Sequence, residues 1–390
     1  MNAYIVTGFR SAVGKAKKGG FRNYRSDDLA VDILTHLIST VPQLDPTLID
    51  DVIVGCANPE GEQGLQVGRL IAARAFGNTV PGMTINRYCA SGLEAIAIAS
   101  SKINAGMGQC YIAGGTESMS LIPMTGYKLA PSYEASMDNI NYHVSMGHTA
   151  EAVAQKYNIT REQADAFSVR SHKLAGEAIA AGKFKDEIVP VTINEVVVEN
   201  DKRVERSYVV DTDEGVRLDT SMEGLGRLRP AFKVGGVVTA GNSSQTSDGS
   251  AFVLVMSEEM VNKLGLNPVA RLVSCAVGGV DPLYMGIGPV VAIPKALKAA
   301  GLTLNDIDLI ELNEAFAVQG LAVMKELNLN PDIVNVNGGA IALGHPLGCT
   351  GAKLSIQVIN ELRRQNKKYG MVTACVGGGQ GIAGVIELLA

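Results

Sequence analysis

Two features that mark large classes of proteins are missing from this sequence: a long apolar run and an excess of positive charge. Although 46% of the 390 residues are hydrophobic, no run of about 18 uninterrupted apolar residues occurs, so we expect no membrane span. The net charge is −5, whereas nucleic-acid-binding proteins usually carry a basic patch or stripe. We therefore expect no nucleic-acid partner, although local basic residues and N–H groups could still gather around an anionic ligand.

The cysteines also lack a pairing pattern. None of the six cysteines forms a C-x-x-C pair, so we expect neither a disulfide framework nor a metal site. Met1–Val6 enters a strand-like run at once, without the basic and apolar segments of a signal peptide. Glu387–Ala390 is not a peroxisomal address. A reducing cytoplasm with free thiols is the predicted location.

The length of the chain suggests two or three domain-sized units. Toward the N-terminus, strand and helix patterns alternate, which favours βαβ units and a mainly parallel sheet. The expected strands are 3–6, 51–54, 83–86 and 109–113, and the expected helices are 28–38, 69–76 and 92–103.

The C-terminal third repeats this alternation. Ile49–Val54 is echoed by Ile307–Leu312, and Pro81–Gly92 aligns loosely with Pro331–Gly351. A duplicated fold explains both, with chance similarity between two α/β halves as the alternative. The expected helices are 293–300, 318–327 and 351–364, and the expected strands are 308–312, 333–336, 371–375 and 382–388.

The middle of the chain has a different composition, richer in charge and loops. It includes the polar tract Glu195–Asp213 and the helix-like stretch Thr160–Ala181. We interpret it as an insertion that covers the functional site, with a plain surface excursion as the alternative. The predicted units are residues 1–117 with 247–266, the insertion 118–246, and residues 267–390.

Cys89 lies where a predicted strand meets a predicted helix, in the segment Asn86–Gly92. The helix that follows is apolar nearly all round, which is typical of a buried helix. A thiol at a helix N-terminus lies near the positive end of the dipole and near free N–H groups, so its pKa should fall. Cys89 is therefore a candidate nucleophile, although a free cysteine is as commonly a small buried apolar residue.

His345 is one of only five histidines and follows the glycine-rich segment Asn337–Gly344. A residue between Gly344 and Pro346 cannot lie in the middle of a helix, so we expect a constrained loop at a strand end. Such a loop can hold an imidazole as a base or as a hydrogen-bond donor. A structural loop histidine is the alternative.

Cys375 ends a predicted strand and precedes residues 377–381, of which four are glycine. Such a run lets the backbone pass close to a ligand and present N–H groups. It lacks the Lys-Ser/Thr ending of a phosphate-binding P-loop, and no long helix follows it as in a dinucleotide site. Asn313 and Glu314 follow another predicted strand, at the edge of the sheet where α/β sites gather.

Together these segments resemble the thiolase family, in the family's order and over the whole chain. The resemblance implies an α/β fold of two duplicated βαβαβαββ halves, arranged as five layers (α-β-α-β-α), with an inserted loop domain. The segments that carry it are the Cys89 turn, Leu228–Phe232, Thr239–Ser244, Asn313–Phe316, Gly338–Pro346 and Cys375–Gly381.

The resemblance also implies a reaction. A 3-ketoacyl-CoA is cleaved by coenzyme A to acetyl-CoA and a shortened acyl-CoA, through an acyl-enzyme on Cys89. His345 would deprotonate Cys89, and Cys375 would move a proton at the α carbon of the substrate. Asn313 would hold a water beside His345, while the N–H groups of Cys89 and Gly377 would form a second oxyanion site. Coenzyme A is a substrate here, so no cofactor is expected.

Four further residues are expected to contact the coenzyme A substrate. Ser244 and Arg217 match family positions that contact the pantetheine and the nucleotide. Met146 matches a residue near the acyl end, and Phe316 of the Asn313 segment is placed with it. The resemblance further implies a homodimer or a homotetramer.

The family divides into synthetic acetoacetyl-CoA enzymes and degradative enzymes of fatty acid β-oxidation. Ser145 precedes Met146 at a position where the resemblance implies a histidine in the synthetic type. Ser244 is followed by Gln245 and Thr246, where that type tends to have glycine. Both departures favour the degradative type, with the biosynthetic thiolase as the alternative. A side chain smaller than histidine at Ser145 would open the acyl end of the cleft, unless Ser145 faces solvent.

Three other classes compete with this interpretation. A decarboxylating ketoacyl synthase pairs its cysteine with two histidines, whereas here the second position is Cys375. A non-catalytic CoA- or lipid-binding protein of the same fold would lack one of the catalytic residues, and none is missing. A nicotinamide enzyme is disfavoured because no G-x-G-x-x-G follows the first strand.

Overall fold

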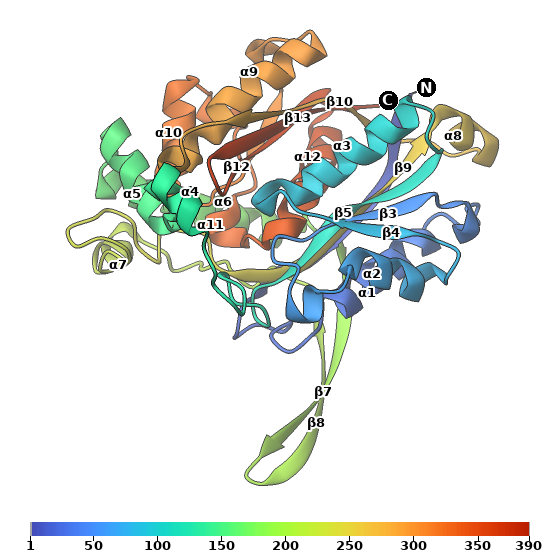
Figure 1. The fold of residues 1–390 in the computed structure, drawn as a ribbon, viewed down its shortest axis with the longest axis horizontal. Helices are drawn as coiled ribbons and strands as arrows, with labels where there is room; N and C mark the ends of the chain where they lie inside the picture. The colour runs from blue at the N-terminus through green and yellow to red at the C-terminus, as the bar shows by residue number, and fades with distance from the viewer. Residues whose placement is uncertain (1, 390) are drawn as a thin grey trace.

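In the computed structural model, which describes residues 2–389, a single sheet runs through the molecule (Figure 1). Its strand order is β4-β3-β5-β9-β1-β10-β13-β12-β11, and β2 and β6 are attached to β9 and β1. The strands are β1 (Ala3–Ser11), β2 (Gly14–Lys15), β3 (Asp51–Gly55), β4 (Gly82–Ile85), β5 (Cys110–Ser118), β6 (Ile188–Val189), β9 (Ser247–Ser257), β10 (Ala270–Gly279), β11 (Leu309–Leu312), β12 (Tyr369–Val376) and β13 (Gln380–Leu388). Met1 and Ala390, with which the first and last predicted units begin and end, lie outside the described residues.

The helices form three layers around this sheet. The longer helices are α1 (Ser26–Ser39), α2 (Val67–Phe76), α3 (Ser91–Asn104), α5 (Met146–Tyr157), α6 (Arg161–Ala180), α9 (Gly288–Ala300), α10 (Ala317–Glu326) and α12 (Leu347–Gln365). The shorter ones are α4 (Tyr133–Asp138), α7 (Met222–Gly226), α8 (Glu258–Leu264) and α11 (Ala340–Leu343). Helices α1 and α2 pack on one outer face, α9 and α10 pack on the other, and α3 and α12 lie between the two parts of the sheet.

The predicted five-layer α/β fold is therefore confirmed, with the two halves of the sheet joined by one pair of strands. The join is a single pairing between β1 and β10, at Ile5 and Ala270. Strand residues alternate between the inner and outer cores: Val52 faces α1 and α2, whereas Ile53 faces α3 and α12. Burial on both faces is why the strands read as nearly continuous apolar runs in the sequence.

The predicted duplication is visible in the backbone pairing of the two halves. Asp50, just before β3, exchanges hydrogen bonds with the start of β5, since its N–H donates to Cys110 and its carboxylate accepts from the Cys110 N–H. Asp308, just before β11, makes the same exchange with Tyr369 at the start of β12. The strand order is likewise mirrored about the β1–β10 pair. Each half is thus the same strand arrangement, built around a middle strand that runs toward the site.

Two expectations about the strands are wrong. The sheet is mixed rather than mainly parallel, because β9 and β13 each return antiparallel between strands of their own half. The strand expected at 333–336 is reduced to a single bridge between Ile310 and Val334. There the side chain of Asn335 replaces the ladder, since it bonds both the N–H and the C=O of Leu312, at 2.8 Å each.

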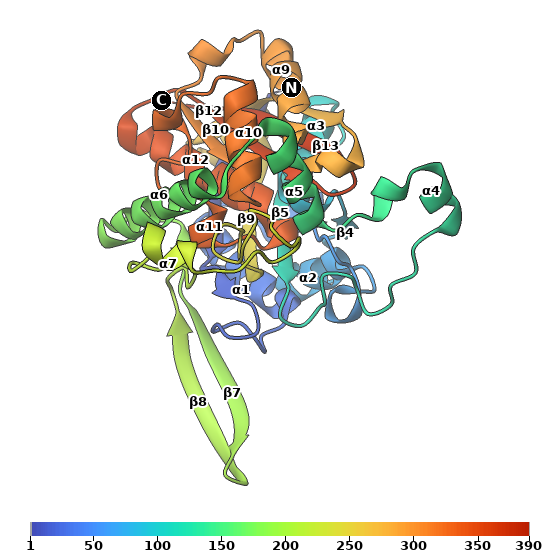
Figure 2. The same cartoon turned by 90° about the vertical axis from the view of Figure 1, so that its left-hand side faces the viewer.

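Two parts of the insertion lie in different places. The polar tract forms the hairpin of β7 (Val191–Glu199) and β8 (Lys202–Val210), which projects away from the body of the molecule (Figures 1 and 2). Helices α5 and α6 and the segment 215–245 instead pack against the C-terminal half. Only this second part lies beside the candidate site, so the expectation that the whole insertion covers the site is wrong for the hairpin. The unit boundaries at 117, 246 and 266 stay a prediction.

Helices α3 and α12 meet closely at their N-terminal ends. A Cβ atom on Gly92 would lie 2.6 Å from the backbone nitrogen of Ala352, and one on Gly351 would collide with that of Leu93. Glycine is therefore required at both positions for the helices to approach. This contact brings the turn that carries Cys89 next to the loop that carries His345.

Candidate active site

Cys89 lies in a short 3-10 turn, residues 88–90, directly before α3. Tyr88 has a φ of +43°, in the left-handed region that bulky residues rarely adopt. The Ser91 hydroxyl accepts from the Arg87 N–H and donates to the Tyr88 carbonyl, both at 2.8 Å, and so fastens the turn. Backbone strain of this kind persists where the surroundings fix it and is common at active sites.

The thiol of Cys89 faces backbone N–H groups of both halves. Those of Cys89 itself and of Gly377 interact with the sulfur, while the carboxylate of Glu117 lies near enough to oppose its ionisation. Burial is the largest influence, and the pKa of Cys89 is raised to about 12. The expectation of a lowered pKa is therefore wrong, because withdrawal from water outweighs the N–H groups and Glu117 adds to it. The resting residue is a thiol.

Cys375 lies at the end of β12, is 1% exposed, and is close to Cys89. Burial and then the charge of a Cys89 thiolate raise the pKa of Cys375 far above its ordinary value. The structure thus brings together the two cysteines that lie 286 positions apart in the sequence. Only one of the pair can ionise readily at a time, because two like charges this close disfavour each other.

His345 is buried, and its hydrogen bonds define which ring nitrogen carries the proton. Nδ1 lies 2.6 Å from Thr350 Oγ1, and that hydroxyl donates its own hydrogen to the carbonyl of Pro346 at 2.9 Å. Thr350 must therefore accept from Nδ1–H, which leaves Nε2 unprotonated and able to accept a hydrogen bond. Burial and the charge of Lys353 lower the pKa of His345 to about 3, so the resting imidazole is neutral.

Asn313 stands beside the unprotonated nitrogen of His345. Its Nδ2 lies 3.3 Å from His345 Nε2, and its backbone N–H donates to the carbonyl of Thr373 in β12. Asn313 Oδ1 is buried and has no hydrogen-bond partner within residues 2–389. Buried polar atoms are rarely left unpaired, so this oxygen is suited to a polar group that enters the site.

Gly377 begins the tight turn between β12 and β13. Gly378 and Gly379 have φ values of +78° and +82°, which explains glycine at these two positions. A Cβ on Gly377 would meet only Tyr88 at 3.5 Å and Met146 at 3.8 Å, which are ordinary contacts. Within residues 2–389, no close contact therefore requires glycine at position 377. A ligand that passes close to this position would explain the glycine.

The structure places Met146 and Phe316 in one apolar cluster with Cys375. Phe316 also packs edge-on against Phe232, with ring centroids 6.2 Å apart. Ser244 lies behind this cluster, where its backbone N–H donates to Ala315. Ser145 is exposed, and its hydroxyl lies 2.8 Å from Nδ1 of His148.

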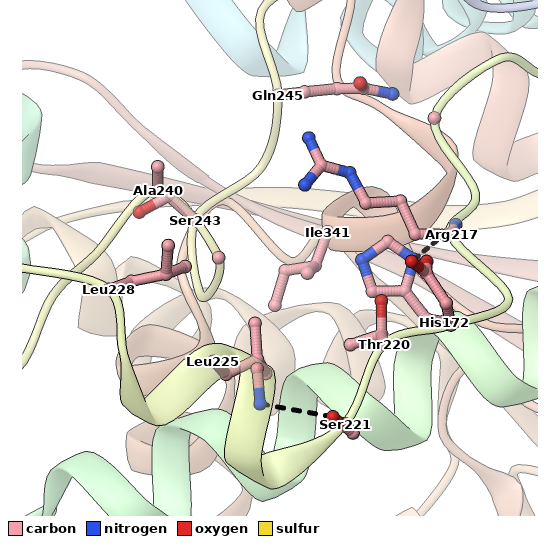
Figure 3. Close-up of a pocket in the computed structure, with 14 residues that line it drawn as sticks. His172, Arg217, Thr220, Ser221, Leu225, Leu228, Ala240, Ser243, Gln245 and Ile341 are labelled. Atoms are coloured by element: carbon pink, nitrogen blue, oxygen red, sulfur yellow. Dashed lines mark hydrogen bonds between the residues drawn. The ribbon is translucent and has the colours of Figure 1, made fainter.

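Arg217 lies further from Cys375, on the wall of a cavity of about 230 Å³ (Figure 3). Its guanidinium group points into the cavity beside Gln245 and has no ion-pair partner among residues 2–389. The side chain of Gln245 reaches the His345 loop, where a Cβ on Gly344 would lie 3.1 Å from its Nε2. The cavity thus extends from a free positive charge toward the imidazole.

Sequence reasoning missed two side chains that shape this site. His172, on α6, accepts the Arg217 N–H at Nδ1, and burial, followed by the charge of Arg217, lowers the pKa of His172 to about 4. Thr350 fixes the proton of His345 as described above. The only available signals were the scarcity of histidine and the position of Thr350 one helical turn beyond the His345-Pro346 pair. Gln245 was noted only as a mark of subclass, yet it lines the cavity and its Nε2 is buried without a partner within residues 2–389.

Two further observations describe the chain as a whole. No helix within residues 2–389 combines the length and the apolar character needed to cross a bilayer. All six cysteines in the described chain are free thiols.

Comparison with known proteins agrees with this geometry. The model for the N-terminal domain of thiolase matches residues 3–259, and the model for its C-terminal domain matches residues 266–388. A 3-ketoacyl-CoA thiolase of Bacillus subtilis is 54% identical over 388 residues, which cover 99% of each chain. One of Psychrobacter cryohalolentis is 45% identical over 98% of this chain and 97% of that relative.

Among solved structures, an acetyl-CoA acetyltransferase of Bacillus anthracis superposes with a TM-score of 0.89 at 41% identity, covering 100% of this chain and 99% of that one. With both domain models matched in order over nearly all residues, the resemblance drawn from the motifs is confirmed, and the chain belongs to the thiolase family of acyltransferases.

Proposed function

We propose that the protein is a degradative thiolase that cleaves 3-ketoacyl-CoA with coenzyme A, through an acyl-enzyme on Cys89. One observation carries the proposal: the Cys89 thiol faces the N–H groups of two separate chain segments, with a second thiol beside it. A nucleophile, an oxyanion site and an independent acid are the minimum that this reaction requires. The 54% identity to a named 3-ketoacyl-CoA thiolase supports the choice of substrate.

In the first half-reaction, Cys89 loses its proton to Nε2 of His345 and its sulfur attacks the β-ketone carbon. The ketone oxygen takes the electron pair, and the N–H groups of Cys89 and Gly377, which both interact with the sulfur in the resting site, would bind that oxyanion. Collapse of the adduct re-forms the carbonyl and breaks the bond between Cα and Cβ. The released pair forms the enolate of acetyl-CoA, which takes a proton from the Cys375 thiol and leaves as acetyl-CoA.

In the second half-reaction, the Cys375 thiolate removes the proton of an incoming coenzyme A. The coenzyme A sulfur attacks the acyl-Cys89 carbonyl, and the sulfur of Cys89 leaves and regains its proton from His345. Each residue ends in its starting state. The neutral imidazole of the resting site supports this cycle, because its unprotonated Nε2 is able to accept a proton.

We propose that Asn313 with His345 forms the site for the enolate oxygen. The support is the orphaned Oδ1 of Asn313 and the contact of its amide nitrogen with the imidazole. A bound water would satisfy that oxygen by donating one hydrogen to it, and could donate its other hydrogen to the enolate oxygen. Loss of one such donor site typically lowers the rate ~10²–10³-fold.

For coenzyme A, we propose the cavity of Figure 3 as the approach to the cysteines. Arg217 supplies a positive charge for the nucleotide phosphates at its outer end. Met146 and Phe316 supply the apolar wall near Cys375, where the acyl chain would lie. The backbone at Ser244 forms part of the wall between Arg217 and these apolar residues. We therefore expect Ser244 to contact the uncharged pantetheine and not the phosphates.

The alternative within the family is a biosynthetic acetoacetyl-CoA thiolase, which runs the same steps in reverse. It is favoured by the name of the Bacillus anthracis structure. The test is to follow loss of the 3-ketoacyl-CoA–magnesium absorbance after adding coenzyme A, beside condensation of acetyl-CoA under matched conditions. Activity confined to four-carbon substrates would assign the chain to the synthetic type.

We propose that the protein works as a homodimer or homotetramer in a reducing cytoplasm. Strand β4 lies at the edge of the sheet, and edge strands are usually covered. Residues 124–142 also carry large exposed apolar side chains, which are typical of an interface: Met124, Tyr127, Leu129, Tyr133, Met137 and Ile140. Light scattering after size exclusion would measure the assembly, and a monomer would contradict it.

A further inference from the structure

Glu117 lies at the end of β5, in the centre of the molecule, with 1% of its surface exposed. Its carboxylate accepts hydrogen bonds from the N–H groups of Ala57 at 2.7 Å, Asn58 at 3.2 Å and Gly348 at 2.8 Å, and from the Gln63 amide at 2.8 Å. The Cys56 thiol approaches within 3.8 Å. No step of the proposed mechanism uses this carboxylate.

The donors to Glu117 come from both halves of the fold. Ala57 and Asn58 follow β3 in the N-terminal half, whereas Gly348 lies in the first turn of α12. His345 stands three residues before Gly348, joined through Pro346. The carboxylate therefore ties the loop that carries the imidazole to the half that carries Cys89.

The backbone at Gly348 packs closely against the backbone of the N-terminal half. A Cβ on Gly348 would lie 2.7 Å from Cys56, and one on Gly115 would collide with the Gly348 carbonyl. A close backbone approach of this kind fixes the position of α12 along the sheet. Glu117 then decides how the first turn of the helix is held.

The contacts of Glu117 also define its charge. Every hydrogen-bond partner within residues 2–389 is a donor, so a proton on the carboxyl would have to face another N–H group. Burial raises the pKa of Glu117, and the N–H groups oppose that effect. We take the ionised form as the resting state, because a carboxylate that accepts several N–H bonds is strongly favoured over its acid.

The neighbouring titratable groups respond to this charge. After burial, the carboxylate raises the pKa of three nearby thiols, those of Cys56, Cys89 and Cys349. Cys375 faces Cys89 from the opposite strand end, and Lys353 faces both His345 and Cys349 from α12. Among these groups, Glu117 both raises the pKa of Cys89 through its charge and accepts a hydrogen bond from the loop that carries His345.

We propose that Glu117 is a positioning residue for the reaction, which fixes His345 relative to Cys89. The inference rests on the proposed function, since it assigns a purpose to the distance between those two residues. It separates two effects of one side chain. Its hydrogen bonds set geometry, and its charge adds to the burial that raises the pKa of the Cys89 thiol.

Two variants of the full-length protein separate these effects. Glu117→Gln keeps the size and removes the charge, so kcat for thiolysis should fall by ~10²-fold with KM little changed, the loss typical of a misplacement of about 1 Å. Alkylation of Cys89 by iodoacetamide at pH 7 should become faster, by ~tenfold for each unit by which the thiol pKa falls. Glu117→Asp keeps the charge but retreats from Gly348, so kcat should fall while alkylation stays at the wild-type rate.

The matched control is Glu361→Gln, at the far end of the same helix. Glu361 is 2% exposed and likewise accepts from several donors, including Asn337 and Arg364. The variant Glu361→Gln should lower thermal stability without changing the rate of Cys89 alkylation or the value of kcat/KM. If Glu117→Gln does not fold, Glu117→Asp alone still tests the geometric part.

Wild-type kcat in both Glu117 variants would overturn the inference. So would losses that track stability as in Glu361→Gln, with no change in alkylation of Cys89. Failure of the proposed function would look different, because Cys89→Ala would then retain thiolysis or the acyl group would map to another residue.

Discussion

The two halves of this protein share a backbone plan and differ in the chemistry placed on it. Counting back from the mutual contact of Gly92 and Gly351, the counterpart of Cys89 is Gly348. One helix end thus carries a thiol, while the equivalent helix end carries an N–H group turned toward Glu117. The duplication supplies two helix N-termini that meet, and only one of them bears the nucleophile.

The middle strands of the two halves show the same divergence. Since Asp50 pairs with Cys110 and Asp308 with Tyr369, the counterpart of Cys375 is Thr116. The Thr116 hydroxyl donates to the Ser26 carbonyl in the core, which is a structural role. The comparison teaches that equivalent positions at a pseudo-twofold centre can be divided between stability and reactivity, and substitutions can test that division.

The largest expected effect is at Cys89. Cys89→Ala should lower thiolysis by ~10³-fold or more, because no other group can carry the acyl intermediate. In the wild type, iodoacetamide should label Cys89 fastest of the six cysteines, and excess acetyl-CoA should protect it. The rate should rise with pH, about tenfold per unit above pH 7, because the thiolate reacts and the pKa lies near 12.

Cys275 is the internal control for this labelling. Like Cys89 it is partly exposed with a pKa raised to about 12, but it lies on β10 outside the site. Acetyl-CoA should leave its labelling unchanged. Peptide mapping that places the acyl group on any residue other than Cys89 would refute the assignment.

The next effect is at the other member of the cysteine pair. Cys375→Ser should lower carbon–carbon bond formation and cleavage by ~10²–10⁴-fold, since a serine hydroxyl is a far weaker acid in a general acid–base role. Transfer of an acetyl group from acetyl-CoA to Cys89 should persist, at least slowly. Trapping the acetyl-enzyme by mass spectrometry, beside steady-state thiolysis, measures the two steps separately.

Thr116→Ser is the matched control, since it makes the same class of change at the equivalent position of the other half. It keeps the hydroxyl that bonds Ser26 and should leave both steps near wild type. Near-full thiolysis by Cys375→Ser would show that the proton comes from elsewhere.

A smaller effect is expected at the cavity of Figure 3. Arg217→Ala should raise the KM for coenzyme A about tenfold while kcat stays within about twofold, because one charge-assisted contact contributes roughly 1.5 kcal/mol. Arg203→Ala on the exposed hairpin removes the same charge away from the cavity and is the control. An equal change of KM in both variants would indicate a general effect of net charge instead.

Much of the fold and the cysteine pair could be predicted from the sequence. The apolar runs of the strands and the echo of Ile49–Val54 in Ile307–Leu312 have local causes, since each element is buried on both faces. The strand expected at 333–336 failed because a single side chain, Asn335, took over the ladder hydrogen bonds. Strand propensity cannot predict this replacement of backbone hydrogen bonds by side-chain ones, because the partner of Asn335 lies 23 residues away in the sequence.

The electrostatics of the site could not be predicted in the same way. A helix N-terminus alone favours thiolate, but the burial of Cys89 and the charge of Glu117 reverse the direction of its pKa shift. Both influences come from segments that only the fold brings together. The tautomer of His345 likewise depends on Thr350, whose hydroxyl is committed to Pro346.

The smallest expected effect concerns the acyl chain, where the sequence favoured a role for Ser145. We expect kcat/KM to be higher for 3-ketoacyl-CoAs longer than acetoacetyl-CoA, by up to ~0.8 kcal/mol or nearly fourfold for each buried methylene. Ser145 itself is exposed and contacts His148, which packs on Phe232 and through it on Phe316. Its influence on the apolar wall is therefore indirect, and Ser145→His should depress longer substrates only a few-fold more than acetoacetyl-CoA. Measurement with four-, six-, eight- and ten-carbon substrates, with Ser145→Ala as the control that removes only the hydroxyl, separates size from hydrogen bonding. A maximum at four carbons with a steep fall beyond would instead place this enzyme with the synthetic thiolases. The reactive positions Cys89 and Cys375 would then catalyse condensation of two acetyl-CoA molecules.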